Sequence, residues 1–128
     1  MKQKIHTDGA PEALGPYSQA VLVGDQLFCS GQIPLDPATG ELVSGGFEAQ
    51  VERVFDNLAA VAAEAGMTLD DAVKVTIYMT DLAKFPVLNE IYAGRFSEPF
   101  PARATVGVAS LPKGAEVEID LVAARGAA

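Results

Sequence analysis

The feature that most constrains the fold is a run of apolar residues spaced by three and four, which begins at Phe47 and ends just before Gly66. Its members are Val51, Val54, Phe55, Leu58, Val61, Ala62 and Ala65. This spacing is the period of one helical face, so it predicts an amphipathic helix. Gly66 stands where a glycine commonly ends a helix. A helix with one apolar face needs a second layer to pack against.

Strict alternation of apolar and polar residues follows this helix. The apolar positions are Val73, Val75, Ile77 and Met79. Such alternation is typical of a strand that buries one face, so a strand is predicted here. Asp81 follows directly and is suited to cap the next helix.

A second stripe of helical period predicts that next helix. The stripe consists of Phe85, Leu88, Ile91, Tyr92 and Phe96. Pro86 must fall in the first turn, because a proline in a helix interior loses a hydrogen bond and clashes with the preceding turn. Pro99 and Pro101 end the helix.

The N-terminal third of the chain reads as strands joined by tight turns. Ala20–Val23 and Leu27–Ser30 are short apolar runs that flank Gly24-Asp25, so they predict a hairpin. Asp36–Gly40 has the composition of a second turn. A brief strand at Glu41–Val43 is expected to follow it.

The C-terminal part predicts another antiparallel hairpin, formed by Arg103–Ser110 and Glu116–Ala123 around a turn at 111–114. If Ser110 pairs with Ala115, one face of this hairpin carries a guanidinium and carboxylates together. The residues expected on that face are Arg103, Thr105, Glu118 and Asp120. A slip of one residue would separate them, and a solvated polar stripe with a surface salt bridge at Arg103 is the alternative interpretation.

The order of elements is therefore strands, helix, strand, helix, strands, which predicts an α+β fold. We expect one domain over residues 1–128, with a mixed β-sheet covered by two helices on one face. The other face of such a sheet also carries apolar side chains. Self-association is the usual way to cover them.

Charge and composition narrow the possible functions. The net charge is -8, from 17 acidic and nine scattered basic residues, which is not the pattern of a nucleic-acid-binding surface. With one cysteine and one histidine, the chain has neither an internal disulfide nor the ligand spacing of a zinc site. We expect no metal, no cofactor and no membrane segment, and a cytoplasmic protein.

Five short motifs, distributed from the N-terminal third to the C-terminal strand, carry a family resemblance. They are Gly15-Pro16-Tyr17-Ser18-Gln19, Ser30-Gly31-Gln32-Ile33-Pro34, Pro101-Ala102-Arg103-Ala104-Thr105-Val106, Leu111-Pro112-Lys113 and Val117-Glu118-Ile119. The chain resembles the reactive intermediate/imine deaminase family (RidA, YjgF type) from Ile5 to about Ala124. The resemblance implies a chorismate-mutase-like fold and a homotrimer with a cleft at each subunit interface.

The resemblance also implies an activity, the hydrolysis of enamines and imines such as 2-aminoacrylate to 2-keto acids and ammonia. Arg103 matches the residue that binds the substrate carboxylate, and Glu118 matches the carboxylate that positions or activates water. Tyr17, Ser30, Gly31 and Asn89 match residues that line the pocket. Tyr17 is expected to be catalytic together with Arg103 and Glu118, and Ser30, Gly31, Asn89 and Thr105 are expected to bind substrate. Thr105 stands where many members have cysteine, and Gly107 stands where members often carry Glu or Gln, which is expected to widen the pocket or change its polarity.

Two other functions remain open at this point. A sensor that binds a 2-keto acid or an amino acid without turnover would use Arg103 in the same way. An endoribonuclease or translation inhibitor, an activity assigned to some members, fits poorly with the acidic charge and the single histidine, His6. Cys29 lies in an apolar strand and is expected to be unreactive core.

Overall fold

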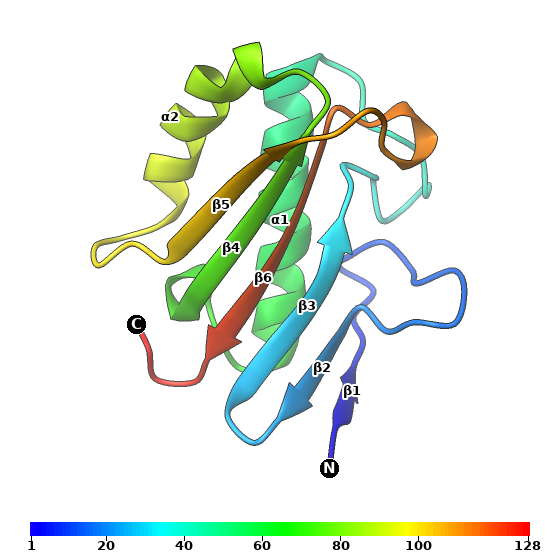
Figure 1. Ribbon diagram of the computed structural model, residues 1–128. Helices are drawn as coiled ribbons and strands as arrows, with labels where there is room; N and C mark the ends of the chain where they lie inside the picture. The colour runs from blue at the N-terminus through cyan, green and yellow to red at the C-terminus, as the bar shows by residue number, and fades with distance from the viewer.

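The computed structural model describes all residues from 1 to 128 and contains one six-stranded sheet, with the strand order β1-β2-β3-β6-β4-β5 (Figure 1). The strands are β1 (Gln3–Ile5), β2 (Ala20–Val23), β3 (Gln26–Gln32), β4 (Ala72–Met79), β5 (Ala102–Gly107) and β6 (Val117–Ala124). Every neighbouring pair is antiparallel except β4 and β5, which run parallel. The prediction of a mixed sheet is confirmed.

Two α-helices pack on one face of this sheet, as predicted. Helix α1 (Phe47–Glu64) lies behind the sheet and contacts β3 and β6, and α2 (Phe85–Arg95) packs beside α1, to the left of β5 in Figure 1. Short 3-10 turns η1 (Leu69–Asp71), η2 (Leu82–Lys84) and η3 (Pro112–Gly114) join the larger elements. None of the helices combines the length and the apolar character that a membrane crossing requires.

The end of α1 and the start of α2 follow from the residues predicted to form them, whereas α2 ends at Arg95, before the two prolines expected to end it. Gly66 has a φ of 74°, the left-handed conformation that favours glycine, and the next amide, that of Met67, donates to the Ala62 carbonyl at 2.9 Å. Asp81 accepts a hydrogen bond from the Ala83 amide and so caps η2, which leads directly into α2. Pro86 lies in the first turn of α2.

The core between sheet and helices includes most of the apolar residues that the helical and strand patterns indicated, together with residues of β1, β2, β3 and β6. The fully buried strand residues include Val75, Ile77 and Met79 of β4. Val73 was expected to join them but is 42% exposed, because the pairing of β4 with β6 shifts register between Ala72 and Lys74. The alternation therefore begins two residues later than predicted.

The N-terminal hairpin is confirmed, since β2 pairs with β3 across a turn in which Gly24 has a φ of 59°. The strand expected at Glu41–Val43 is wrong. This segment forms only a single bridge, between Leu35 and Leu42.

The predicted C-terminal hairpin, Arg103–Ser110 with Glu116–Ala123, is also wrong. β4 lies between β5 and β6, pairing with β5 on one side and β6 on the other. The cause is the connection through α2, because two strands joined by a helical crossover pair in parallel. β5 therefore occupies the sheet edge.

This topology separates the residues expected on one face. Arg103 pairs with Val75, which faces the helices, whereas Glu118 pairs with Tyr78 on the open face. The remaining two residues of the predicted set divide in the same way, with Thr105 on the helix side and Asp120 on the open side.

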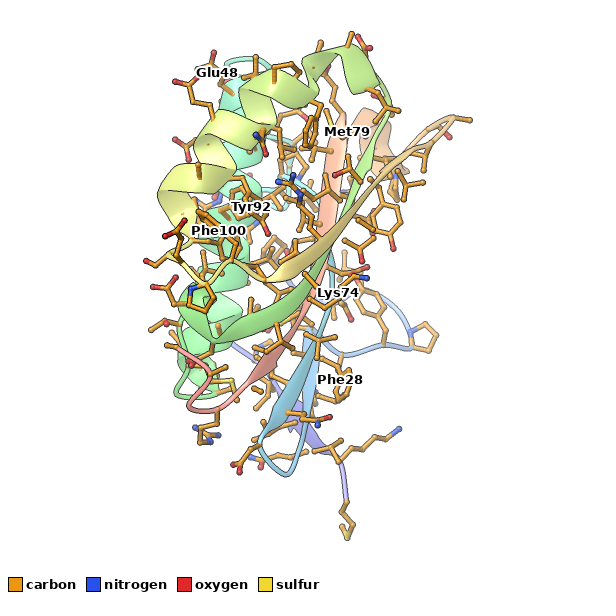
Figure 2. The ribbon with its side chains drawn as sticks, turned by 60° about the vertical axis from the view of Figure 1, so that its left-hand side comes forward. Phe28, Glu48, Lys74, Met79, Tyr92 and Phe100 are labelled. Atoms are coloured by element: carbon orange, nitrogen blue, oxygen red, sulfur yellow. The ribbon has the colours of Figure 1, made fainter.

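The open face of the sheet carries several apolar side chains that nothing in the chain covers. Phe28, Val23 and Val106 are each more than 40% exposed. Figure 2 shows Phe28 projecting from the side of the sheet that lies away from the helices. The chain thus has an apolar sheet face available for contact.

Candidate functional site

An open cleft of about 800 Å³ lies at the end of β3 on the side of β6. Four of the residues singled out in the sequence line it together, namely Tyr17, Ser30, Gly31 and Glu118. The rest of its wall comes from residues 11–19, residues 32 and 33, the loop 35–40 and the turn at 112–113. The cleft is large enough for a small organic substrate.

Glu118 is half-buried on β6 and extends towards the backbone of β3. The approach is so close that any side chain at Gly31 would overlap the Glu118 carboxylate. Burial raises the pKa of Glu118 above its ordinary value, and the negative charge of Asp120 raises it further. A carboxyl group of this kind can exchange protons nearer neutral pH than a free glutamate can.

The loop that carries Tyr17 is held by a buried glutamine. Gln19 accepts a hydrogen bond from the Thr7 amide at 2.8 Å, and its own amide donates to the carbonyls of Thr7 and Pro11 at 3.0 and 2.8 Å. Ser30 donates its hydroxyl proton to the Ser18 carbonyl at 2.6 Å. The Ser30 oxygen can therefore only accept further hydrogen bonds, from a ligand or from water.

Arg103 lies in a different hollow, of about 380 Å³, between β5 and α2. Its Nη1 donates to Oδ1 of Asn89 at 2.7 Å, so the structure brings these two predicted residues together. Figure 2 shows Tyr92 and Phe100, which also line this hollow, on the opposite side of the sheet from Phe28. Within one chain, the predicted site is therefore divided into two groups.

Thr105 and Gly107 belong to neither group. Thr105 is half-buried on the helix side of β5 and lines neither cavity. Gly107 was expected to widen the pocket or change its polarity; it lines neither cavity, and the Cδ1 of Leu82 lies 3.0 Å from where its Cβ would lie.

Sequence reasoning missed the roles of three residues, one that holds the Tyr17 loop and two that contact Arg103. Gln19 was expected only as part of the motif 15–19, and the residues around it in the sequence did not indicate that its side chain holds the loop that carries Tyr17. Phe85 and Tyr92 were expected only as core residues of α2, yet the Arg103 guanidinium lies 5.1 Å from the Phe85 ring centroid and 4.7 Å from that of Tyr92. The only sign of this contact in the sequence was that an arginine follows closely after a helix with a stripe of aromatic residues.

The other reactive side chains play no part in these hollows. Cys29 is buried, as expected, and burial raises the pKa of its thiol to about 12. His6 is exposed and lies 3.3 Å from Asp8. No three His, Cys, Asp or Glu side chains are grouped in a way that could hold a metal ion.

Comparison with known proteins places the chain in a family. A sequence profile of the family described as Endoribonuclease L-PSP matches residues 7–125. Protein DfrA of Myxococcus xanthus is 53% identical over 124 residues, which cover 95% of each chain. The human protein named 2-iminobutanoate/2-iminopropanoate deaminase is 44% identical over 126 residues, which cover 98% of this chain and 92% of the human one.

A solved structure agrees with these matches. RidA from an Antarctic Psychrobacter is 52% identical and superposes with a TM-score of 0.92, over 95% of this chain and 98% of that one. Sequence and fold therefore correspond over nearly the whole chain. The chain belongs to the RidA (YjgF) family, whose profile carries the description Endoribonuclease L-PSP.

Proposed function

We propose that this protein is a deaminase that hydrolyses reactive imines and enamines derived from amino acids, such as 2-aminoacrylate, to 2-keto acids and ammonia. The observation that carries the proposal is the carboxyl group of Glu118, which lies in an open cleft with its pKa raised by burial. The human relative at 44% identity is named for this reaction.

The reaction needs little chemical force, because the carbon of an imine is already electrophilic. A solvent proton adds to the enamine carbon of 2-aminoacrylate and gives the iminium ion. Water then adds to the iminium carbon while the C=N electron pair moves to nitrogen, and Glu118 would accept a proton from this water and pass it to nitrogen. The hydroxyl group of the adduct then gives its proton to Glu118, the C=O bond forms as the C–N bond breaks, and ammonia leaves; Glu118 returns its proton to solvent.

Tyr17, Ser30 and Gly31 would shape the cleft around the reacting carbon. The Ser30 oxygen can accept a hydrogen bond from substrate nitrogen or from water, and the exposed Tyr17 can donate or accept one through its hydroxyl. Gly31 keeps the space beside Glu118 open.

Arg103 would bind the substrate carboxylate with two parallel hydrogen bonds. It faces away from Glu118 within its own chain, so we propose that Arg103 of one subunit completes the cleft of the next in a homotrimer. Two structural features support this arrangement, the edge position of β5 and the uncovered apolar face around Phe28 and Val106. Asn89 and Thr105 would then border the carboxylate end of the substrate.

The experiment for the activity couples the protein to a pyridoxal-phosphate-dependent serine or threonine dehydratase and traps the released imine with semicarbazide. The deaminase should divert flux from the trapped product to free keto acid. Absence of any diversion, with keto acid still bound, would favour a sensor instead. Cleavage of RNA by the purified protein would favour the ribonuclease, which the net charge of -8 opposes.

Light scattering tests the assembly. A homotrimer of this 13.3 kDa chain has a mass of about 40 kDa. The monomer mass at micromolar concentration would contradict a site shared between subunits.

A further inference from the structure

Helix α2 supplies the hydrogen-bond acceptor and both aromatic rings that interact with the Arg103 guanidinium. Asn89 accepts one hydrogen bond from Nη1 at 2.7 Å, and the rings of Phe85 and Tyr92 lie 5.1 and 4.7 Å from Cζ. Both distances are within the range in which an aromatic ring attracts a cation. Phe85, Asn89 and Tyr92 follow each other at intervals of four and three, so they form one stripe along the helix.

These contacts leave most of the guanidinium free. Arginine has five N–H donors, and only one is used, by Asn89. The rings act on the guanidinium without consuming any N–H. Contacts of this kind fix the orientation of the planar guanidinium group, while its remaining N–H donors stay available for a carboxylate.

Arg95 provides a comparison within the same chain. Its guanidinium also lies over an aromatic ring, that of Phe55 at 5.7 Å, but it forms ion pairs with Glu52 and Asp56 at 3.0 and 2.9 Å. Arg103 has aromatic contacts of similar distance and no carboxylate partner. Arg95 therefore serves in ion pairs within the chain, whereas Arg103 is held by aromatic rings and one amide and has no carboxylate partner.

Tyr92 is suited to act as a rigid support. It is only 4% exposed, and its ring packs against those of Phe96 and Phe55 at centroid distances of 4.5 and 6.1 Å. Its hydroxyl is buried without any hydrogen-bond partner, and burial raises the pKa of this hydroxyl while the charge of Arg103 opposes the rise. The ring, rather than the hydroxyl, makes the contact with Arg103.

We propose that Phe85 and Tyr92 are positioning residues that hold the Arg103 guanidinium between their rings, so that its free donors are oriented before a carboxylate ligand arrives. The inference rests on the proposed role of Arg103 in binding substrate. Holding the fork in advance reduces the side-chain entropy lost on binding, so the rings should act on affinity rather than on the chemical step.

The test uses four variants: Tyr92→Leu and Phe85→Leu remove a ring, and Tyr92→Phe and Phe85→Tyr keep it. In free protein, NMR should show Arg103 side-chain protons shifted upfield by the rings and slow rotation about the Cζ–Nε bond. Both signatures should weaken in each leucine variant, which keeps one ring, and persist in full in each aromatic variant. Free rotation in the parent, or unchanged signatures in both leucine variants, would overturn the proposal.

Calorimetric titration of 2-ketobutyrate gives the second readout. Each leucine variant should bind about tenfold more weakly, with KM raised and kcat nearly unchanged, while the aromatic variants bind like the parent. If Tyr92→Phe lost as much affinity as Tyr92→Leu, the hydroxyl would be responsible and the ring proposal would be wrong. If the parent neither bound keto acid nor turned over imine, the proposed function would fail, and the NMR series would still decide whether the rings hold Arg103.

Discussion

Arg103 and Glu118 project from opposite faces of the same sheet, and β4 separates their strands. Two strand spacings alone place them about 10 Å apart, before their offset along the strands is added. A substrate with a three- or four-carbon chain cannot contact both within one subunit. If both residues serve one reaction, they must come from different subunits.

Replacing Arg103 by lysine tests the carboxylate clamp. Lysine keeps the charge but loses the planar fork, so affinity for 2-ketobutyrate should fall by about 10 to 150-fold, the equivalent of one charge-assisted hydrogen bond of about 1.5 to 3 kcal/mol. The melting temperature should change little, because Arg103 is exposed and forms no ion pair, and lysine keeps the positive charge beside the Phe85 and Tyr92 rings. Calorimetry and a melting curve measure the two effects, and a lysine variant that binds like the parent would remove Arg103 from the site.

Glu118→Gln preserves shape and removes basicity. Turnover should fall by roughly 10² to 10⁴, the range of general acid-base catalysis, while keto-acid binding persists. The base form of Glu118 exists only above its raised pKa, so parental kcat/KM should rise with pH through that pKa and then level off. A glutamine variant with the parent's rate and pH profile would show that another group handles the proton.

The same substitution should change the pH dependence of stability. The folded protein retains the Glu118 proton at pH values above 4.5 at which the unfolded chain has released it, because the folded pKa is raised. The stability that this proton contributes is complete below the unfolded pKa and is lost as pH rises through the folded one. In thermal melts, the melting temperature of Glu118→Gln should therefore rise relative to that of the parent as the pH is raised from acidic to neutral. A constant difference across that range would mean that folding does not perturb Glu118.

Gly31→Ala tests the close approach of Glu118 to β3. The added methyl group overlaps the carboxylate, so Glu118 must move and kcat/KM should fall by about 100-fold, as expected for a catalytic group displaced by about 1 Å. Gly94→Ala in α2 is the matched control, because a methyl group there meets nothing within 4 Å. Equal activity of both variants would show that the position of Glu118 is not critical.

The sequence predicted those parts of the fold that local patterns determine. The spacing of three and four from Phe47 to Ala65 placed α1, and the alternation through Ile77 placed β4. These patterns arise because each element buries one face, and the spacing of apolar residues within the element shows which face that is. The composition of the site followed from family motifs, and the grouping of Tyr17 with Glu118 agrees with them.

The pairing of distant strands could not be predicted in the same way. β5 and β6 follow each other along the chain and resemble a hairpin, but α2 joins β4 to β5 and so directs β5 to the edge of β4. Strand pairing decides from which face of the sheet each side chain projects. Because the pairing was predicted wrongly, Arg103 was placed on the wrong face. The contact between Arg103 and α2 was missed for the same reason.

The central claim, that each site joins Arg103 of one subunit to Glu118 of the next, is tested most directly by subunit mixing. Arg103→Ala and Glu118→Gln chains should each be nearly inactive alone, and the two are co-expressed in equal amounts with different tags. In a cyclic trimer, every mixed assembly contains one intact site, so random mixing should restore about a quarter of the parental activity per subunit. Activity no higher than that of the separate variants, with mixed trimers isolated through both tags, would contradict a site shared between subunits.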